Sequence, residues 1–191
     1  MSRTGDELGA PEHLTALHDL TAFDSGEPWL DDWLRRRALA NGEGGASRTY
    51  VVCARERVVG YYALATGAVG RADAARGIRR NMPDPIPMMV LGRLAVDRAY
   101  QRRGLGAALL GDAVLRTLQA AEIGGIRGIL VHAISDEARR FYERNGFLVS
   151  PMNPMTLMIS VAAAKAVARG RGSLARNTTA SGRGVWAPCG W

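Results

Sequence analysis

The stretch LGRLAVDRAYQRRGLGAALL, residues 91–110, constrains the fold more than any other part of this chain. An apolar run of strand length leads into a short polar loop, and the loop leads into a glycine-punctuated helix. The first amides of a helix have no intrahelical acceptor and lie at the positive end of its dipole, so they can bind a phosphate. Gly104 and Gly106 would let the ligand approach closely, and Arg102 and Arg103 add positive charge. The stretch therefore predicts a pyrophosphate site.

Other phosphate-binding motifs match this stretch less well. GxxxxGK[ST] is absent, and Leu109 stands where the dinucleotide fingerprint has a third small residue, so neither an NTPase nor a Rossmann oxidoreductase is supported. The two glycines alone do not establish a phosphate site, because a purely structural role for them is also possible. In that alternative Gly104 ends a turn and Gly106 relieves packing.

The rest of the chain alternates between segments of strand and helix periodicity. We expect helices over residues 27–40, 104–121 and 136–145, a helical turn within 68–80, and strands over 49–54, 58–65, 88–96, 129–133 and 156–161. The first two strands form a hairpin, and the later elements run strand, helix, strand, helix, strand. This pattern predicts an α/β domain with a single core, in keeping with 191 residues of which 47% are hydrophobic.

Composition sets the limits of the domain and its location. We expect one folded domain over residues 1–164 and a disordered tail over 165–191, because the tail is rich in Gly, Ser and Arg without periodicity. No apolar run approaches the roughly 20 residues that span a bilayer, and the first ten residues lack a signal-peptide pattern, so a cytoplasmic protein without a membrane segment is expected. Cys53 and Cys189 have no nearby cysteine or histidine in the sequence, which predicts no metal site and makes Cys53 a small core residue.

The formal charge of +7 is unevenly distributed along the chain. Five basic residues and no acid follow residue 164, which leaves +2 for residues 1–164. Eight arginines face three aspartates between residues 71 and 103, whereas the first 34 residues hold eight acids and one arginine. The chain is electrically polarised, with a basic stretch around the predicted phosphate site.

The sequence QRRGLG, residues 101–106, resembles the Q/R-x-x-G-x-G/A acetyl-CoA loop of GNAT acetyltransferases. The resemblance implies acetyl-CoA as co-substrate and a GNAT fold, in which helices flank a mixed, largely antiparallel sheet with a splayed strand pair at the acetyl-CoA site. Backbone amides in the loop would hold the pyrophosphate, and the preceding strand would pair with the pantetheine arm. The implied acetyl-CoA-binding residues are Leu94, Ala95, Val96, Arg102, Arg103, Gly104, Leu105, Gly106 and Ala107.

A second motif, ARRFYERNGF over residues 138–147, is similar to the A-x-x-F-Y-x-x-x-G-F signature of the same family. The resemblance implies that Tyr142 is the general acid that protonates the departing CoA thiolate. A tyrosine is suited to this role because its reference pKa of about 10 keeps it protonated at neutral pH. Burial preferences alone would favour simple packing of Tyr142 on the sheet.

The group that removes the proton of the acceptor amine is not evident from the sequence. No carboxylate lies in residues 88–96, the strand in which many relatives keep a catalytic glutamate. An α-amine, with a pKa of about 7.7–8.0, is already partly neutral at pH 7, whereas a lysine amine near 10.4 is rarely so. The sequence therefore favours an α-amine acceptor, with the proton passing to a water relay or to a base still to be identified.

A closer resemblance, over residues 11–161, is to the TacT/KacT/AtaT-like toxins, GNAT enzymes that acetylate aminoacyl-tRNA and stop translation. It rests on LTAFDSGEPWLDDWL from residue 20, on RTLQAAEIGGIRGILVH from residue 116 and on the two motifs above. It implies a ribbon-helix-helix antitoxin and a homodimer. A tRNA substrate needs phosphate-facing cations, for which the candidates are Arg76, Arg79, Arg80 and Arg93.

Three alternatives stay open at this point. The arginines could form an ordinary solvated face. The enzyme could act on a small amine or a protein N-terminus, because residues 1–164 carry little net charge. The fold could also serve as a non-catalytic module that binds acyl-CoA or nucleic acid.

Overall fold

The computed structural model describes residues 8–168. Seven strands form one sheet in the order β1-β2-β3-β4-β5-β7-β6, and only the β4–β5 pair is parallel. The strands are β1 Glu12–His13, β2 Arg48–Ala54, β3 Arg57–Val69, β4 Ile86–Val96, β5 Gly128–His132, β6 Leu148–Val149 and β7 Thr156–Ser160. The helices are α1 Pro28–Arg36, α2 Ala38–Glu43, α3 Arg76–Arg79, a 3-10 turn Arg98–Tyr100, α4 Leu105–Ile123 and α5 Asp136–Arg144. The predicted α/β fold with a mixed, largely antiparallel sheet is confirmed.

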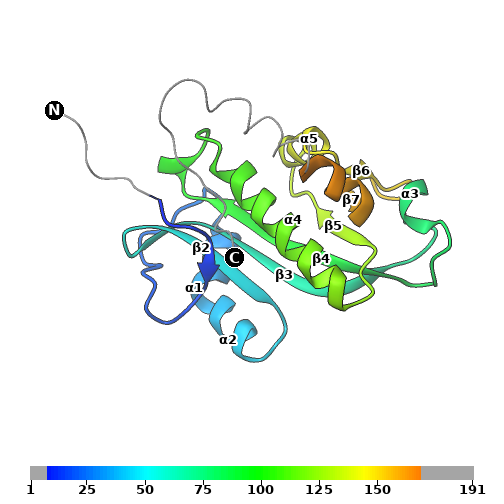
Figure 1. The fold of residues 1–191 in the computed structure, drawn as a ribbon. Coiled ribbons are helices and arrows are strands. Elements are labelled where there is room, and N and C mark those ends of the chain that lie inside the picture. The colour runs from blue at the N-terminus through cyan, green and yellow to red at the C-terminus, as the bar shows by residue number, and fades with distance from the viewer. Residues whose placement is uncertain (1–7, 169–191) are drawn as a thin grey trace, which may run out of the picture.

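The two faces of the sheet are covered by different helices (Figure 1). On one face α4 and α5 pack on side chains such as Val59, Tyr62 and Ile129. On the other face α1 covers one end, around Phe23 and Tyr61, and α3 covers the other end around Met88. The division follows from strand geometry, since successive side chains point to opposite faces.

The structure departs from the predicted elements in a few places. The single helix expected over residues 27–40 is two helices, because the backbone leaves the helical region at Arg37, with φ −123° and ψ −29°. The strands β1 and β6 were not predicted. Each has two residues, too short for any periodicity to show.

The fold also extends past the predicted domain boundary at residue 164. Residues 161–168 are helical, Ala164 is buried, and Lys165 forms an ion pair with Glu122 at 2.8 Å. The rest of the expected disordered tail, 169–191, lies outside the described residues. Within residues 8–168 no helix is both long and apolar enough to cross a membrane.

Candidate active site

The start of α4 is built to bind an anion. Gly104 caps this helix in the left-handed conformation with φ +83°, and no side chain caps the exposed amides. The first helical hydrogen bond runs from Ala108 N to Gly104 O, so the amides of residues 105–107 have no acceptor within residues 8–168. Arg102 also has a positive φ, of 60°. Left-handed residues that alternate with ordinary ones turn successive amides toward one point, which makes a cradle for a phosphate group.

Two parallel strands diverge beside this cradle. The strands β4 and β5 pair only from Met89 to Leu91 and from Ile129 to Val131, although β4 continues to Val96. A register shift in the β3–β4 ladder near Gly92 accompanies the divergence. Beyond Leu91 the edge of β4 that faces β5 has no strand partner among the described residues. Backbone groups of residues 94–96 can therefore bond to an extended ligand lying in this fork, which we call the β4–β5 fork.

Gly106 joins the cradle to the second motif. A Cβ atom at Gly106 would lie 3.8 Å from Val96 Cγ2 and 4.0 Å from Phe141 Cζ. The first turn of α4 therefore lies between the end of β4 and α5, the helix that carries Tyr142. The side chain of Ser135 caps α5 by accepting a hydrogen bond from Ala138 N.

Tyr142 lies in the core beside these elements. Only 8% of the residue is exposed, and its ring contacts Phe141 and Phe147 at centroid distances of 5.3 and 5.5 Å. Burial raises the pKa of its phenol to about 12. The hydroxyl is thus held in its protonated form, the form that a proton donor needs.

Hydrogen bonds hold the loop before α4 in place. The buried carboxylate of Asp97 accepts from Asp24 N at 3.2 Å, from Ala99 N at 2.9 Å and from Arg57 Nη2 at 2.9 Å. Gln101 Nε2 donates to Ser25 O at 2.8 Å and to Val96 O at 2.9 Å. This network fixes the approach to the cradle. Both segments carry part of the family resemblance, but the sequence gives no sign that they bond to each other, because 76 residues separate Gln101 from Ser25.

The predicted arginine cluster is not one patch. Arg76, Arg79 and Arg80 are exposed at α3, where buried Ile78 anchors the turn, and no acid within residues 8–168 pairs with them. The α4 cradle lies at the opposite end of the molecule (Figure 1). The eleven residues of β4 separate the two ends by roughly 30 Å at about 3.3 Å per residue.

Arg93 stands apart from the arginines of α3. It lies within β4, and its guanidinium stacks on the ring of Trp33 at 4.0 Å from the centroid. Its Nε atom is buried without a hydrogen-bond partner among the described residues. The four candidate arginines therefore lie in two places, because this basic stretch of sequence continues through the strand β4.

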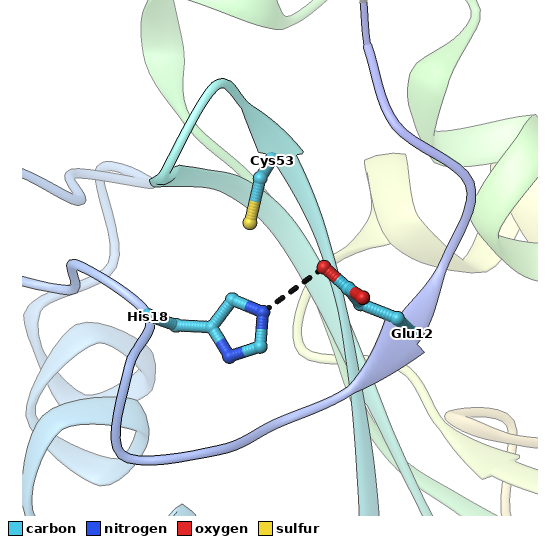
Figure 2. A group of neighbouring side chains, drawn as sticks. All are labelled: Glu12, His18 and Cys53. Atoms are coloured by element: carbon cyan, nitrogen blue, oxygen red, sulfur yellow. Dashed lines mark hydrogen bonds and ion pairs between the residues drawn. The ribbon is translucent and has the colours of Figure 1, made fainter.

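The fold brings together a third group of side chains, Glu12, His18 and Cys53, whose ligand atoms lie within 4.8 Å of one another (Figure 2). Thr15 N donates to His18 Nδ1 at 3.0 Å, and in the tautomer that matches this bond Nε2–H donates to Glu12 Oε1 at 3.1 Å. Burial, and then the charge of Glu12, raise the pKa of the Cys53 thiol to about 11. A metal ion would need the lone pair of Nε2 and a thiolate at Cys53. As arranged, the group instead forms a hydrogen bond between Glu12 and His18 beside β2. Burial of Cys53 confirms it as a core residue.

Comparison with protein families identifies the domain. The model of the acetyltransferase (GNAT) domain matches residues 45–149, more than half of the chain. This chain belongs to the GNAT acetyltransferase family. The match includes β4, the β4–β5 fork, the α4 cradle and α5 with Tyr142.

Several toxins are similar to this GNAT protein over nearly their whole length. A tRNA-acetylating toxin of Mycobacterium tuberculosis (strain ATCC 25618 / H37Rv) is 54% identical over 158 residues, which cover 83% of this chain and 95% of that protein. Among solved structures, AtaT complexed with acetyl-methionyl-tRNAfMet is 30% identical with a TM-score of 0.78, covering 84% of this chain and 99% of AtaT. A mutant of KacT is 26% identical with a TM-score of 0.79, covering 84% and 98%. The resemblance to TacT/KacT/AtaT-like toxins is confirmed.

Proposed function

We propose that this protein transfers the acetyl group of acetyl-CoA to the α-amine of an aminoacyl-tRNA and thereby blocks translation, as the toxin of a toxin–antitoxin pair. The observation that carries the enzymatic part is the convergence at Gly106, which brings the α4 cradle, the end of β4 and the helix of Tyr142 within van der Waals reach. The acceptor is supported by the 54% identity to a tRNA-acetylating toxin and by the fold shared with tRNA-bound AtaT.

The cofactor-binding residues predicted from the sequence fit this arrangement. Amides of residues 102–107 hold the pyrophosphate of acetyl-CoA, with positive charge from Arg102 and Arg103. The pantetheine arm lies in the β4–β5 fork and pairs with the backbone of residues 94–96. This places the thioester next to the fork and near α5. An AtaT variant bound to acetyl-CoA has the same fold, with a TM-score of 0.71.

Tyr142 acts as the general acid. The amine attacks the thioester carbonyl, the adduct collapses with cleavage of the C–S bond, and the phenol of Tyr142 gives its proton to the departing thiolate. The hydroxyl remains available for this step because burial raises its pKa to about 12. Neutralising the thiolate favours collapse of the adduct toward the amide product.

The exposed arginines of α3 contact tRNA phosphates, and Arg93 with Trp33 forms a platform nearer the acetyl group. We further propose a cytoplasmic homodimer that is neutralised by a ribbon-helix-helix antitoxin. Support for an antitoxin partner comes from the AtaT variant bound to the C-terminus of the antitoxin AtaR, which is 31% identical to this chain with a TM-score of 0.72.

The test compares wild type with Tyr142→Phe in acetyl transfer from labelled acetyl-CoA to a panel of charged and uncharged tRNAs. We expect only charged tRNA to be acetylated, and a rate at least about 100-fold lower in the variant, since general acids contribute about that much or more. Expression of wild type should arrest growth, and expression of Tyr142→Phe should not.

Tyr50→Phe is the matched control, because Tyr50 is a buried tyrosine of the same core that stacks on Tyr62 away from the β4–β5 fork. It should keep the wild-type rate. Growth arrest by Tyr142→Phe would refute the role of the phenol. Acetylation of polyamines or peptides in place of charged tRNA would refute the acceptor.

A further inference from the structure

One histidine lies at the β4–β5 fork. His132 is the last residue of β5, and the pairing of β5 with β4 ends one residue earlier, at Val131 opposite Leu91. The side chain of His132 is exposed, whereas the four preceding residues of β5 are buried. His132 is thus the first residue of β5 beyond the point at which the two strands part.

The side chain of His132 lies on the face of the sheet opposite to Tyr142. Ile129 and Val131 point into the core under α4 and α5, which also contains Tyr142. Leu130 points to the other face, and His132 must follow it because side chains alternate along a strand. Arg93 is on this second face as well, since its guanidinium stacks on Trp33 of α1.

A hydrogen bond orients the imidazole. Thr156 is the register partner of His132 on β7, and its buried hydroxyl oxygen lies 2.9 Å from His132 Nδ1. In the tautomer in which Nδ1–H donates to Thr156 Oγ1, the lone pair of Nε2 is free to accept a proton. No side chain or backbone group of residues 8–168 bonds to that Nε2 atom.

The strands β4, β5 and β7 carry no acid, and the two buried carboxylates near the site already accept hydrogen bonds. Asp97 is saturated by two amides and Arg57, and Asp31 accepts hydrogen bonds from the backbone and hydroxyl of Ser25. An attacking amine that enters opposite to the acid therefore meets an imidazole at the fork and no free carboxylate on the flanking strands. Histidine is the most frequent general base in enzymes, because its reference pKa of about 6.5 leaves a neutral ring at pH 7.

We propose that His132 is the general base of the reaction, with Thr156 as the residue that positions it; this rests on the acetyltransferase function proposed above. The amine nitrogen forms a bond to the thioester carbonyl carbon and loses a proton to His132 Nε2. The C–S bond then breaks, and the thiolate takes the proton of Tyr142 on the other face. Proton exchange with solvent returns His132 to its neutral form and Tyr142 to its protonated form, so the net change is amine and thioester to amide and thiol.

The test measures kcat and KM of the full chain for His132→Ala and His132→Gln. We expect kcat to fall by about 100-fold in both variants, with the KM for acetyl-CoA within twofold of wild type. Added imidazole should restore part of the rate of His132→Ala, because a free base can enter the vacated space. Thr156→Val should lower kcat by about tenfold and leave the KM for acetyl-CoA unchanged.

His13→Ala is the matched control, because His13 is an exposed histidine on β1 whose ring contacts Tyr50 at a centroid distance of 4.3 Å. It should keep the wild-type kcat and show no response to imidazole. A wild-type kcat in His132→Ala would overturn the proposal. So would a loss of rate that imidazole does not restore in a variant with wild-type thermal stability and acetyl-CoA affinity.

The two proposals fail in distinguishable ways. The substitutions at His132 are assayed with whichever amine the wild type acetylates. If the wild type does not acetylate charged tRNA, the proposed acceptor is wrong. The role of His132 is then tested with the amine that the wild type does acetylate. If the wild type acetylates charged tRNA and His132→Ala is equally active, only the proposed role of His132 as general base is wrong.

Discussion

At Gly104 a single backbone angle shapes the α4 cradle, the proposed binding site of the acetyl-CoA pyrophosphate. Its φ of +83° is disfavoured for any residue with a Cβ atom, although the space around Gly104 is open. Gly104→Ala should therefore shift the local backbone and turn the amides of residues 105–107 away from the pyrophosphate. We expect the KM for acetyl-CoA to rise at least tenfold. The free energy of unfolding, measured in urea, should fall by about 1 kcal/mol.

Gly45→Ala separates backbone strain from ligand binding. Gly45 also has a positive φ, of +76°, with open space around it, and it lies in the loop between α2 and β2. It should lose a similar amount of stability and keep the wild-type KM. Equal KM values for the two alanine variants would mean that the conformation of Gly104 is not what binds acetyl-CoA.

Residues of the site differ in how far the sequence could reveal them. The uncapped helix start at Gly104 was predictable, because a glycine in front of an apolar-periodic helix is a signal that is local in sequence. His132 was not, because its position depends on where β4 and β5 part and on a hydroxyl 24 residues away. The bonds of Gln101 and Asp97 to the segment before α1 were hidden for the same reason.

Among the elements, β5 and β7 approach each other unusually closely at Gly128. A Cβ atom there would lie 2.2 Å from Ile159 O, and a backbone carbonyl within a sheet cannot move aside. Gly128→Ala should destabilise the protein by about 3 kcal/mol in urea unfolding, near the upper end for overpacking. Gly125→Ala, where a Cβ atom would meet nothing within 4 Å, should change stability by less than about 0.5 kcal/mol. Equal stability of the two variants would show that β7 can shift to make room.

Most long elements were predictable from periodicity and the short ones were not. The periodicity of residues 104–121 is continuous, and the observed α4, Leu105–Ile123, differs from the prediction only at its ends. The break at Arg37 could not be predicted, because Leu34 and Ala38 on either side of it keep the i, i+4 spacing of one continuous apolar face. The divergence of β4 from β5 was expected from the family resemblance alone. The hydropathy pattern shows that a strand forms but does not show where its pairing with a neighbouring strand ends.

Across residues 8–168, the positive charge of α3 and the α4 cradle lie at opposite ends of β4 (Figure 1). A small amine that reaches the β4–β5 fork would not touch α3, whereas a tRNA acceptor arm is long enough to contact both. Charge at α3 should therefore matter for a nucleic-acid substrate and be irrelevant to a small one. This difference allows the tRNA contacts to be tested apart from the chemistry.

Replacing Arg76, Arg79 and Arg80 together with alanine should raise the KM for charged tRNA and leave the KM for acetyl-CoA unchanged. Each lost phosphate contact should lower the slope of log KM against log salt concentration by about one, because fewer counterions are released on binding. The measurement is acetyl transfer to charged tRNA at several salt concentrations. Arg55→Ala, which removes an exposed arginine in the β2–β3 turn, should leave the slope unchanged. An unchanged slope in the triple variant would place the tRNA on another surface, with Arg93 and Trp33 as the remaining contacts near the acetyl group.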